Sequence, residues 1–126
     1  MNLDGLIVAV DFDGTCVTHE YPGVGRGIGA ADVLKEMAGR GAKLILWTMR
    51  SGVHLDNAVN WFASHDIPLF GVNSNPEQST WTTSPKVYAQ LYIDDAALGA
   101  PLIYGEGARP YVDWSSVRKM LGLGTP

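Results

Sequence analysis

The chain has 126 residues, with 9 Lys and Arg against 13 Asp and Glu, and this length leaves no room for a second folded domain. A hydrophobic content of 46% is typical of a folded domain and disfavours a disordered chain. The net charge of -4 disfavours nucleic acid or an anionic membrane as the main partner, although a local basic pocket is compatible with it. We therefore expect a single domain over residues 1–126.

The cysteine count and the N-terminal segment bear on the compartment. Cys16 is the single cysteine, so neither an internal disulfide nor a zinc site with several cysteines can form. Residues 1–14 lack the basic flank and cleavage site of a signal peptide, and no apolar run approaches the roughly 20 residues that span a bilayer. We expect a cytoplasmic protein without a membrane partner, in which Cys16 packs as a small hydrophobe.

Strand-like and helix-like patterns alternate along the chain. In the first half they predict a strand at residues 6–10, a helix around 33–38 ended by Gly41, a strand at 44–47 and a helix around 55–63. In the second half they predict strands at 69–72 and 91–93, a candidate strand at 101–104, and a helix at 114–121 between Asp113 and Gly122. Such alternation in a short chain indicates an α/β fold with a parallel sheet and right-handed crossovers.

Polar side chains follow the carboxyl ends of three predicted strands, which is the edge where open α/β sheets bind ligands. They are Asp11 and Asp13 after the first strand, Thr48 and Arg50 after the second, and Asp94 and Asp95 after the fourth. Carboxylates that converge there repel one another unless a cation or protons neutralise them. Ligands that are all oxygen atoms, without convergent His or Cys, favour Mg²⁺.

These residue types are the parts needed for phosphoryl transfer. Thr48 can donate a hydrogen bond to a phosphate, and Lys86 offers a positive charge for a phosphate oxygen. Asp11 can attack phosphorus and form an aspartyl-phosphate. Asp13 can protonate the leaving oxygen and later deprotonate the attacking water. Gly14 permits a sharp turn next to the phosphate, and we expect Thr15, which follows it, to order that turn.

Four segments of the chain resemble the four motifs of haloacid dehalogenase-like phosphatases, in the same order and over nearly the whole chain. They are Asp11-Phe12-Asp13-Gly14-Thr15, Leu46-Trp47-Thr48, Lys86 and Ile93-Asp94-Asp95. The resemblance implies a three-layer Rossmann-like fold with a parallel central sheet. It also implies that Mg²⁺ is held by Asp11, the main-chain carbonyl of Asp13, and the acidic pair, with Asp95 as the first choice. The second aspartate of the first motif implies chemistry on phosphate rather than on carbon–halogen bonds.

The chain departs from the family pattern in two respects. Lys86 lies only eight positions before Asp94, closer than the family often places its lysine, so Arg50 is the alternative phosphate-binding cation. The 28 residues between Thr15 and Leu44 are also too few for a large cap domain. We expect a capless enzyme. One hypothesis is that a flap at residues 23–29, which contains Arg26, covers one side of the site, and that a loop at 73–84, which contains Trp81, or a neighbouring subunit covers the other. The alternative is that a large phosphorylated partner covers the site with its own surface.

Other side chains are candidates for the margin of the site. We expect Thr15, Arg26, Asn73 and Trp81 near the substrate. We interpret His19, His54 and His65 as surface or capping residues, and the alternative for His19 is contact with the substrate from the flap. The main hypothesis is a Mg²⁺-dependent phosphomonoesterase whose substrate is a phosphorylated small molecule or macromolecule. The rivals are a phosphatase of nucleic-acid ends or proteins that uses the open site, and a non-catalytic phosphate-binding or receiver-like module. The acidic composition disfavours nucleic acid, and oligomeric state is left open.

Overall fold

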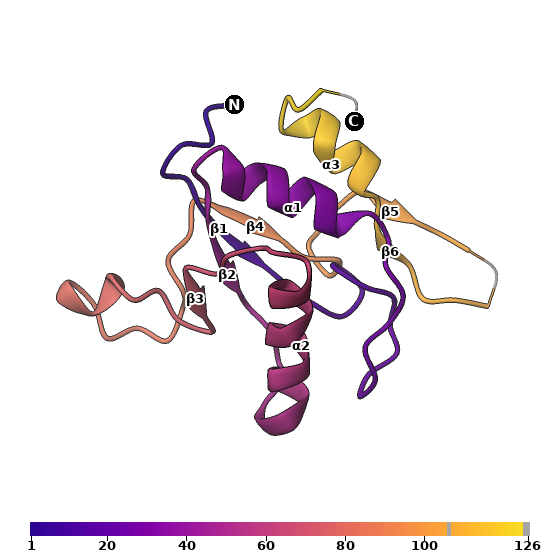
Figure 1. Ribbon diagram of the computed structural model, residues 1–126, viewed down its shortest axis with the longest axis horizontal. Coiled ribbons are helices and arrows are strands. Elements are labelled where there is room, and N and C mark those ends of the chain that lie inside the picture. Colours follow the sequence, from indigo (N-terminus) through magenta and orange to yellow (C-terminus); the bar gives the residue numbers. More distant parts are fainter. Residues whose placement is uncertain (106, 125–126) are drawn as a thin grey trace.

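The computed structural model describes residues 1–105 and 107–124 (Figure 1). In chain order its elements are β1 (Ile7–Val10), α1 (Ala30–Gly39), β2 (Lys43–Leu46), α2 (Gly52–Ser64), β3 (Gly71–Val72), the 3₁₀ turn η1 (Gln78–Thr80), β4 (Leu91–Ile93), β5 (Leu102–Ile103), β6 (Tyr111–Val112) and α3 (Trp114–Met120). The first four strands form one parallel sheet in the order β3-β2-β1-β4. Helices flank this sheet, so the predicted α/β fold is confirmed and is consistent with a Rossmann-like three-layer arrangement.

Both faces of the two central strands are buried. Val8 pairs with Leu44 and Val10 with Leu46 in register, and all four belong to the main hydrophobic core. Because side chains alternate along a strand, Ala9 lies on the opposite face, where it pairs with the equally buried Ile45. Burial on both faces explains why these strands appear in the sequence as continuous apolar runs rather than as alternating patterns.

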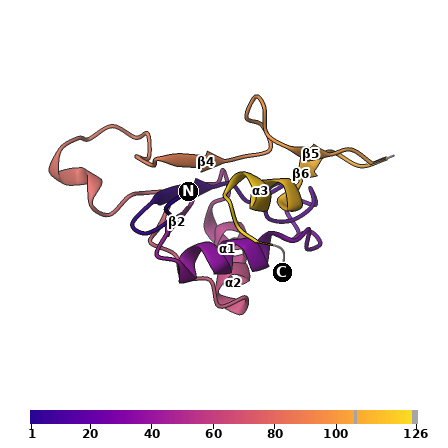
Figure 2. The same ribbon diagram turned by 90° about the horizontal axis from the view of Figure 1, so that it is seen from above.

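The helix boundaries follow the expected glycine and capping signals. Gly29 precedes α1 with φ of 93°, and Gly41 follows it with φ of 98°, a backbone region that favours glycine. Asp113 caps α3 by accepting hydrogen bonds from the backbone N–H groups of Ser115 and Ser116. Figures 1 and 2 show α1 and α3 side by side. None of the helices in residues 1–105 and 107–124 is long and apolar enough to cross a membrane.

Two expectations about the strands need correction. The candidate strand at residues 101–104 is shorter, β5, and it pairs antiparallel with the unpredicted β6 instead of joining the parallel sheet. The eight residues between β4 and β5 are too few for the crossover that a parallel strand requires. The strand expected at 69–72 is reduced to β3, and η1 lies within the polar segment that follows. This segment and the β5–β6 hairpin extend from opposite ends of the molecule (Figures 1 and 2).

Candidate active site

Three carboxylates meet at the carboxyl edge of the parallel sheet. Asp11 follows β1, and Asp94 and Asp95 follow β4; each offers one oxygen, and these oxygens all lie within 4.8 Å of one another. The cluster lines a cavity of about 580 Å³. Other residues that line this cavity include Asp13, His19, Tyr21, Thr48, Arg50 and Arg109. The strand-end aspartates, Thr48 and Arg50 are therefore brought together as the sequence predicts.

A buried threonine hydroxyl joins the β1 and β4 ends of this cluster. Thr15 Oγ1 donates a hydrogen bond to Asp11 Oδ2 at 2.8 Å and accepts one from the backbone N–H of Asp95 at 3.0 Å. Thr15 is fully buried. It therefore lies beneath the carboxylates and orders them, instead of reaching the substrate as the sequence analysis expects.

The Asp11 carboxyl group has unusual electrostatics. Burial, together with the nearby Asp94 and Asp95, raises the pKa of Asp11 to about 8, although the hydrogen bond from Thr15 acts in the opposite direction. Without a cation, a carboxyl group in these surroundings is held in its neutral form at neutral pH. A divalent cation bound by the cluster would restore the carboxylate, so the donor set and its electrostatics both fit a hard metal ion such as Mg²⁺.

Gly14 makes room for His19, which lies in the cavity lining. Gly14 has φ of 78°, and a Cβ there would collide with the His19 imidazole and approach the Asp95 carboxylate within 2.7 Å. His19 Nε2 lies 2.9 Å from Asp95 Oδ2. The expectation that His19 is a surface residue is therefore wrong. No periodic pattern in the sequence points to this contact, because it depends on the path of the loop after β1.

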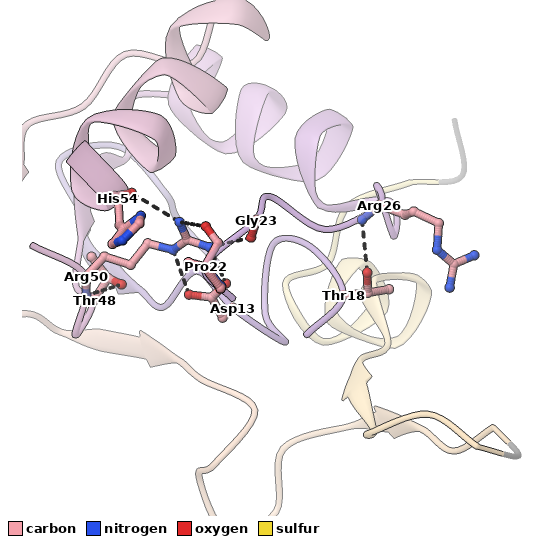
Figure 3. Close-up of polar contacts among 8 residues, drawn as sticks. All are labelled: Asp13, Thr18, Pro22, Gly23, Arg26, Thr48, Arg50 and His54. Carbon is pink, nitrogen blue, oxygen red and sulfur yellow. Dashed lines mark hydrogen bonds and ion pairs between the residues drawn. The ribbon is translucent and has the colours of Figure 1, made fainter. Parts of the chain in front are cut away.

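The second aspartate of the β1 loop is paired with Arg50. Arg50 Nε donates to Asp13 Oδ2 at 2.9 Å, and its Nη2 donates to Asp13 Oδ1 at 2.8 Å (Figure 3). The remaining N–H groups of the guanidinium donate to three backbone carbonyls. All five donors are thus used, which leaves none for phosphate. We therefore correct the expectation that Arg50 is a phosphate-binding cation.

The backbone around Thr48 is fixed by Asn73. The Thr48 backbone N–H donates to Asn73 Oδ1 at 2.8 Å, and Asn73 adopts φ of 53°, which asparagine tolerates better than most residues. The backbone N–H of Arg50 donates to Thr48 Oγ1 at 3.2 Å. Because that bond uses the hydroxyl oxygen as acceptor, the hydroxyl hydrogen of Thr48 remains available for a ligand. Asn73 thus orients Thr48 and does not itself line the cavity.

Three of the cations and aromatic residues predicted near the substrate lie elsewhere. Lys86 Nζ is 5.9 Å from the centre of the Tyr92 ring, and both residues line a separate cavity of about 290 Å³ together with Trp81. Trp81 is exposed there. The side chain of Arg26 points away from the Asp13–Arg50 pair (Figure 3), and its backbone N–H donates to the Thr18 hydroxyl.

Arg109 is the cavity-lining cation that the sequence analysis misses. It lies between β5 and β6, so its place in the cavity depends on a hairpin that the sequence does not predict. Arg109 thus adds a second cation to the lining of this cavity, where the five donors of Arg50 are already used.

The fold and the site define an α/β protein whose Rossmann-like sheet carries an aspartate cluster at its carboxyl edge. A solved structure of a conserved protein from Bacteroides thetaiotaomicron is similar, with a TM-score of 0.75 and 32% sequence identity over 94% of this chain and 91% of that chain. The chain belongs to the same family as that conserved protein. Comparisons with protein-family models and with curated proteins found no match.

Proposed function

We propose that the protein is a Mg²⁺-dependent phosphatase of the haloacid dehalogenase-like type, which hydrolyses phosphate monoesters through an aspartyl-phosphate on Asp11. The observation that carries this proposal is the meeting of Asp11, Asp94 and Asp95 within 4.8 Å, in a cavity that Asp13 and Thr48 also line. Residues with the types and order of three of that family's four motifs thus lie at one site. The fourth, Lys86, does not.

The acidic cluster supports the metal assignment. Asp11, Asp94 and Asp95 offer only oxygen donors, and burial, together with the nearby Asp94 and Asp95, raises the pKa of Asp11. When bound, Mg²⁺ would offset the repulsion between the Asp11 carboxylate and the phosphate oxygens. The Asp13 carboxylate is engaged by Arg50, so this residue would contribute through its main-chain carbonyl rather than its side chain.

The chain's own residues account for the two chemical steps. In the first, an Asp11 carboxylate oxygen bonds to phosphorus while the bond to the leaving oxygen breaks. Asp13, which would enter this step in its protonated form, gives that oxygen a proton and becomes the carboxylate that Arg50 pairs with. In the second, Asp13 takes a proton from water, whose oxygen bonds to phosphorus while the bond to Asp11 breaks. The Thr48 hydroxyl would donate a hydrogen bond to a phosphate oxygen during both steps.

Substrate recognition would fall to the open rim of the cavity. Arg109 supplies the cation that binds substrate oxygens, in place of Lys86. Tyr21 is exposed beside it, and Met49 is 99% exposed, so the rim also offers apolar surface to a leaving group. A rim this open would accept a phosphorylated small molecule or the phosphate of a larger partner.

The proposal is tested by assaying purified protein with Mg²⁺ against phosphorylated metabolites, nucleotides and oligonucleotide ends. We expect release of phosphate from at least one class, loss of that activity in excess chelator, and no turnover by Asp11→Asn. Hydrolysis that persists in Asp11→Asn would contradict the nucleophile assignment. Binding of phosphate esters without any turnover would favour the non-catalytic phosphate-binding module.

A further inference from the structure

We infer that Arg50 is a positioning residue that orients the Asp13 carboxylate and fastens residues 21–23 beside it, so that the acid/base and one wall of the cavity form a single unit. The chemical consequence for Asp13 rests on the proposed function. The mechanical link between Arg50, Asp13 and residues 21–23 does not, because it is a matter of contacts alone.

The guanidinium of Arg50 joins three separate segments. It binds both oxygens of Asp13 after β1 and donates to the Gly23 carbonyl at 2.7 Å and the Pro22 carbonyl at 3.1 Å. A fifth bond, to the His54 carbonyl at 3.1 Å, ties the same group to the first turn of α2. Figure 3 shows these acceptors gathered around one side chain. A change in the position of any one segment would therefore disturb the others.

Aromatic packing against the guanidinium fixes the arrangement further. Arg50 is only 3% exposed, and its guanidinium carbon lies 5.1 Å from the ring centre of Phe12 and 5.1 Å from that of Tyr21. The two rings add cation–π contacts to the five hydrogen bonds. Arg50 is thus held both by its donors, all of which are used, and by aromatic packing.

Asp13 depends on this arrangement for its orientation. In the described part of the chain, Arg50 supplies the hydrogen bonds to the Asp13 carboxylate. A bidentate contact fixes the carboxylate plane, which a single-point donor such as lysine cannot do. Without Arg50, the Asp13 side chain would be free to rotate away from the leaving oxygen. The rate of proton transfer from Asp13 would fall, and the decrease in kcat/KM would be largest for leaving groups that need a proton.

Leaving-group dependence provides the test. We would measure kcat/KM for Arg50→Gln, Arg50→Lys and Asp13→Asn with an alkyl phosphate and with p-nitrophenyl phosphate, whose leaving group departs without a proton. For Arg50→Gln we expect a loss of about 100-fold with the alkyl ester and under about 10-fold with the p-nitrophenyl ester. The double variant should lose no more than Asp13→Asn alone, because Arg50 acts through Asp13.

Arg118→Gln is the matched control. Arg118 is another buried, paired arginine: it donates to Glu36 Oε1 at 2.8 Å and to the Gly124 carbonyl at 2.9 Å, and it does not line the cavity. Its replacement should leave the ratio of the two kcat/KM values unchanged. Equal losses on both esters in Arg50→Gln, or losses that add to those of Asp13→Asn, would overturn the positioning role.

Amide hydrogen exchange tests the mechanical link independently of turnover. Asp13→Asn removes the charged partner of Arg50 and so loosens residues 21–23. Exchange of the nearby Arg26 backbone N–H, which donates to the Thr18 hydroxyl, should then speed up by about tenfold, whereas the exposed-residue variant Asp56→Asn should not change it. Unchanged exchange in Asp13→Asn would overturn the link even if the protein hydrolyses no phosphate ester. If Arg50→Gln does not fold, the kinetic comparison is made with Arg50→Lys. The exchange measurement on Asp13→Asn depends on neither Arg50 variant and still tests the mechanical link.

Discussion

Replacing Asp11 with Asn should stabilise the metal-free protein at neutral pH. Burial and the charges of Asp94 and Asp95 raise the pKa of Asp11 to about 8, whereas an unfolded aspartate titrates near pH 4. Between these values the unfolded chain carries the negative charge and the folded chain does not, so the stability of the metal-free wild type falls as the pH rises. Asparagine does not ionise in either state and avoids this loss.

The size of the effect follows from the separation of the two pKa values. Each pH unit between them costs the wild type about 1.4 kcal/mol, so at pH 7 the upper bound is about 4 kcal/mol. Asp11 lines an open cavity, and water that reaches it reduces the cost of ionisation. We expect Asp11→Asn to gain about 2 kcal/mol at pH 7 and almost nothing near pH 4. A gain of that size corresponds to roughly 6 °C in Tm for a domain of this length.

Urea unfolding in excess EDTA between pH 4.5 and 8.5 measures this difference directly. The control is Asp56→Asn, because Asp56 is exposed on α2. Adding Mg²⁺ should cancel the advantage of Asp11→Asn, because only the wild type keeps the full ligand set. A stability difference that does not change with pH, or a variant less stable than the wild type throughout, would refute the electrostatic account of the cluster.

Other predictions follow from single contacts in the cavity. Thr15→Val should lower the free energy of unfolding by about 1–2 kcal/mol and reduce kcat/KM, because it removes the hydroxyl that joins two loops, whereas Thr15→Ser should retain most of both. Gly14→Ala should lower the free energy of unfolding, measured in urea, by more than Gly5→Ala does. Both positions have a positive φ, but only a side chain at residue 14 would clash with other side chains, and equal losses would argue against this clash. Arg109→Gln should raise KM about tenfold in steady-state assays while Lys86→Gln leaves it unchanged, and the opposite result would return Lys86 to the site.

The centre of the site could be predicted because it depends on strand ends. Asp11 and Asp94 each end a short apolar run, and parallel strands place their carboxyl ends at one edge of the sheet. The same reasoning placed Thr48 at that edge, and the structure brings it into the same cavity. The α/β fold was predictable for a related reason, since strand and helix patterns alternate with few interruptions.

The rest of the site depends on how loops run, which periodic patterns do not encode. Lys86 lines another cavity. The backbone of its loop is held by the Gln78 side chain, which donates to the Lys86 carbonyl at 2.8 Å and accepts from the Tyr88 N–H at 2.7 Å. Arg109 reaches the cavity through an antiparallel hairpin that the sequence pattern does not reveal. The pairing of Arg50 with Asp13 joins residues 37 positions apart, and no local signal marks it.

The most direct test of the central claim is to look for the phosphoryl group on Asp11. Wild type and Asp13→Asn would be mixed with Mg²⁺ and an aryl phosphate, quenched in acid within a turnover, and mapped by mass spectrometry. The account predicts a phosphoryl group on residue 11, with a larger fraction in Asp13→Asn, because that variant lacks the base for the second step. Turnover by the wild type with no phosphoryl group on Asp11 in either protein, or with the group on another residue, would contradict it.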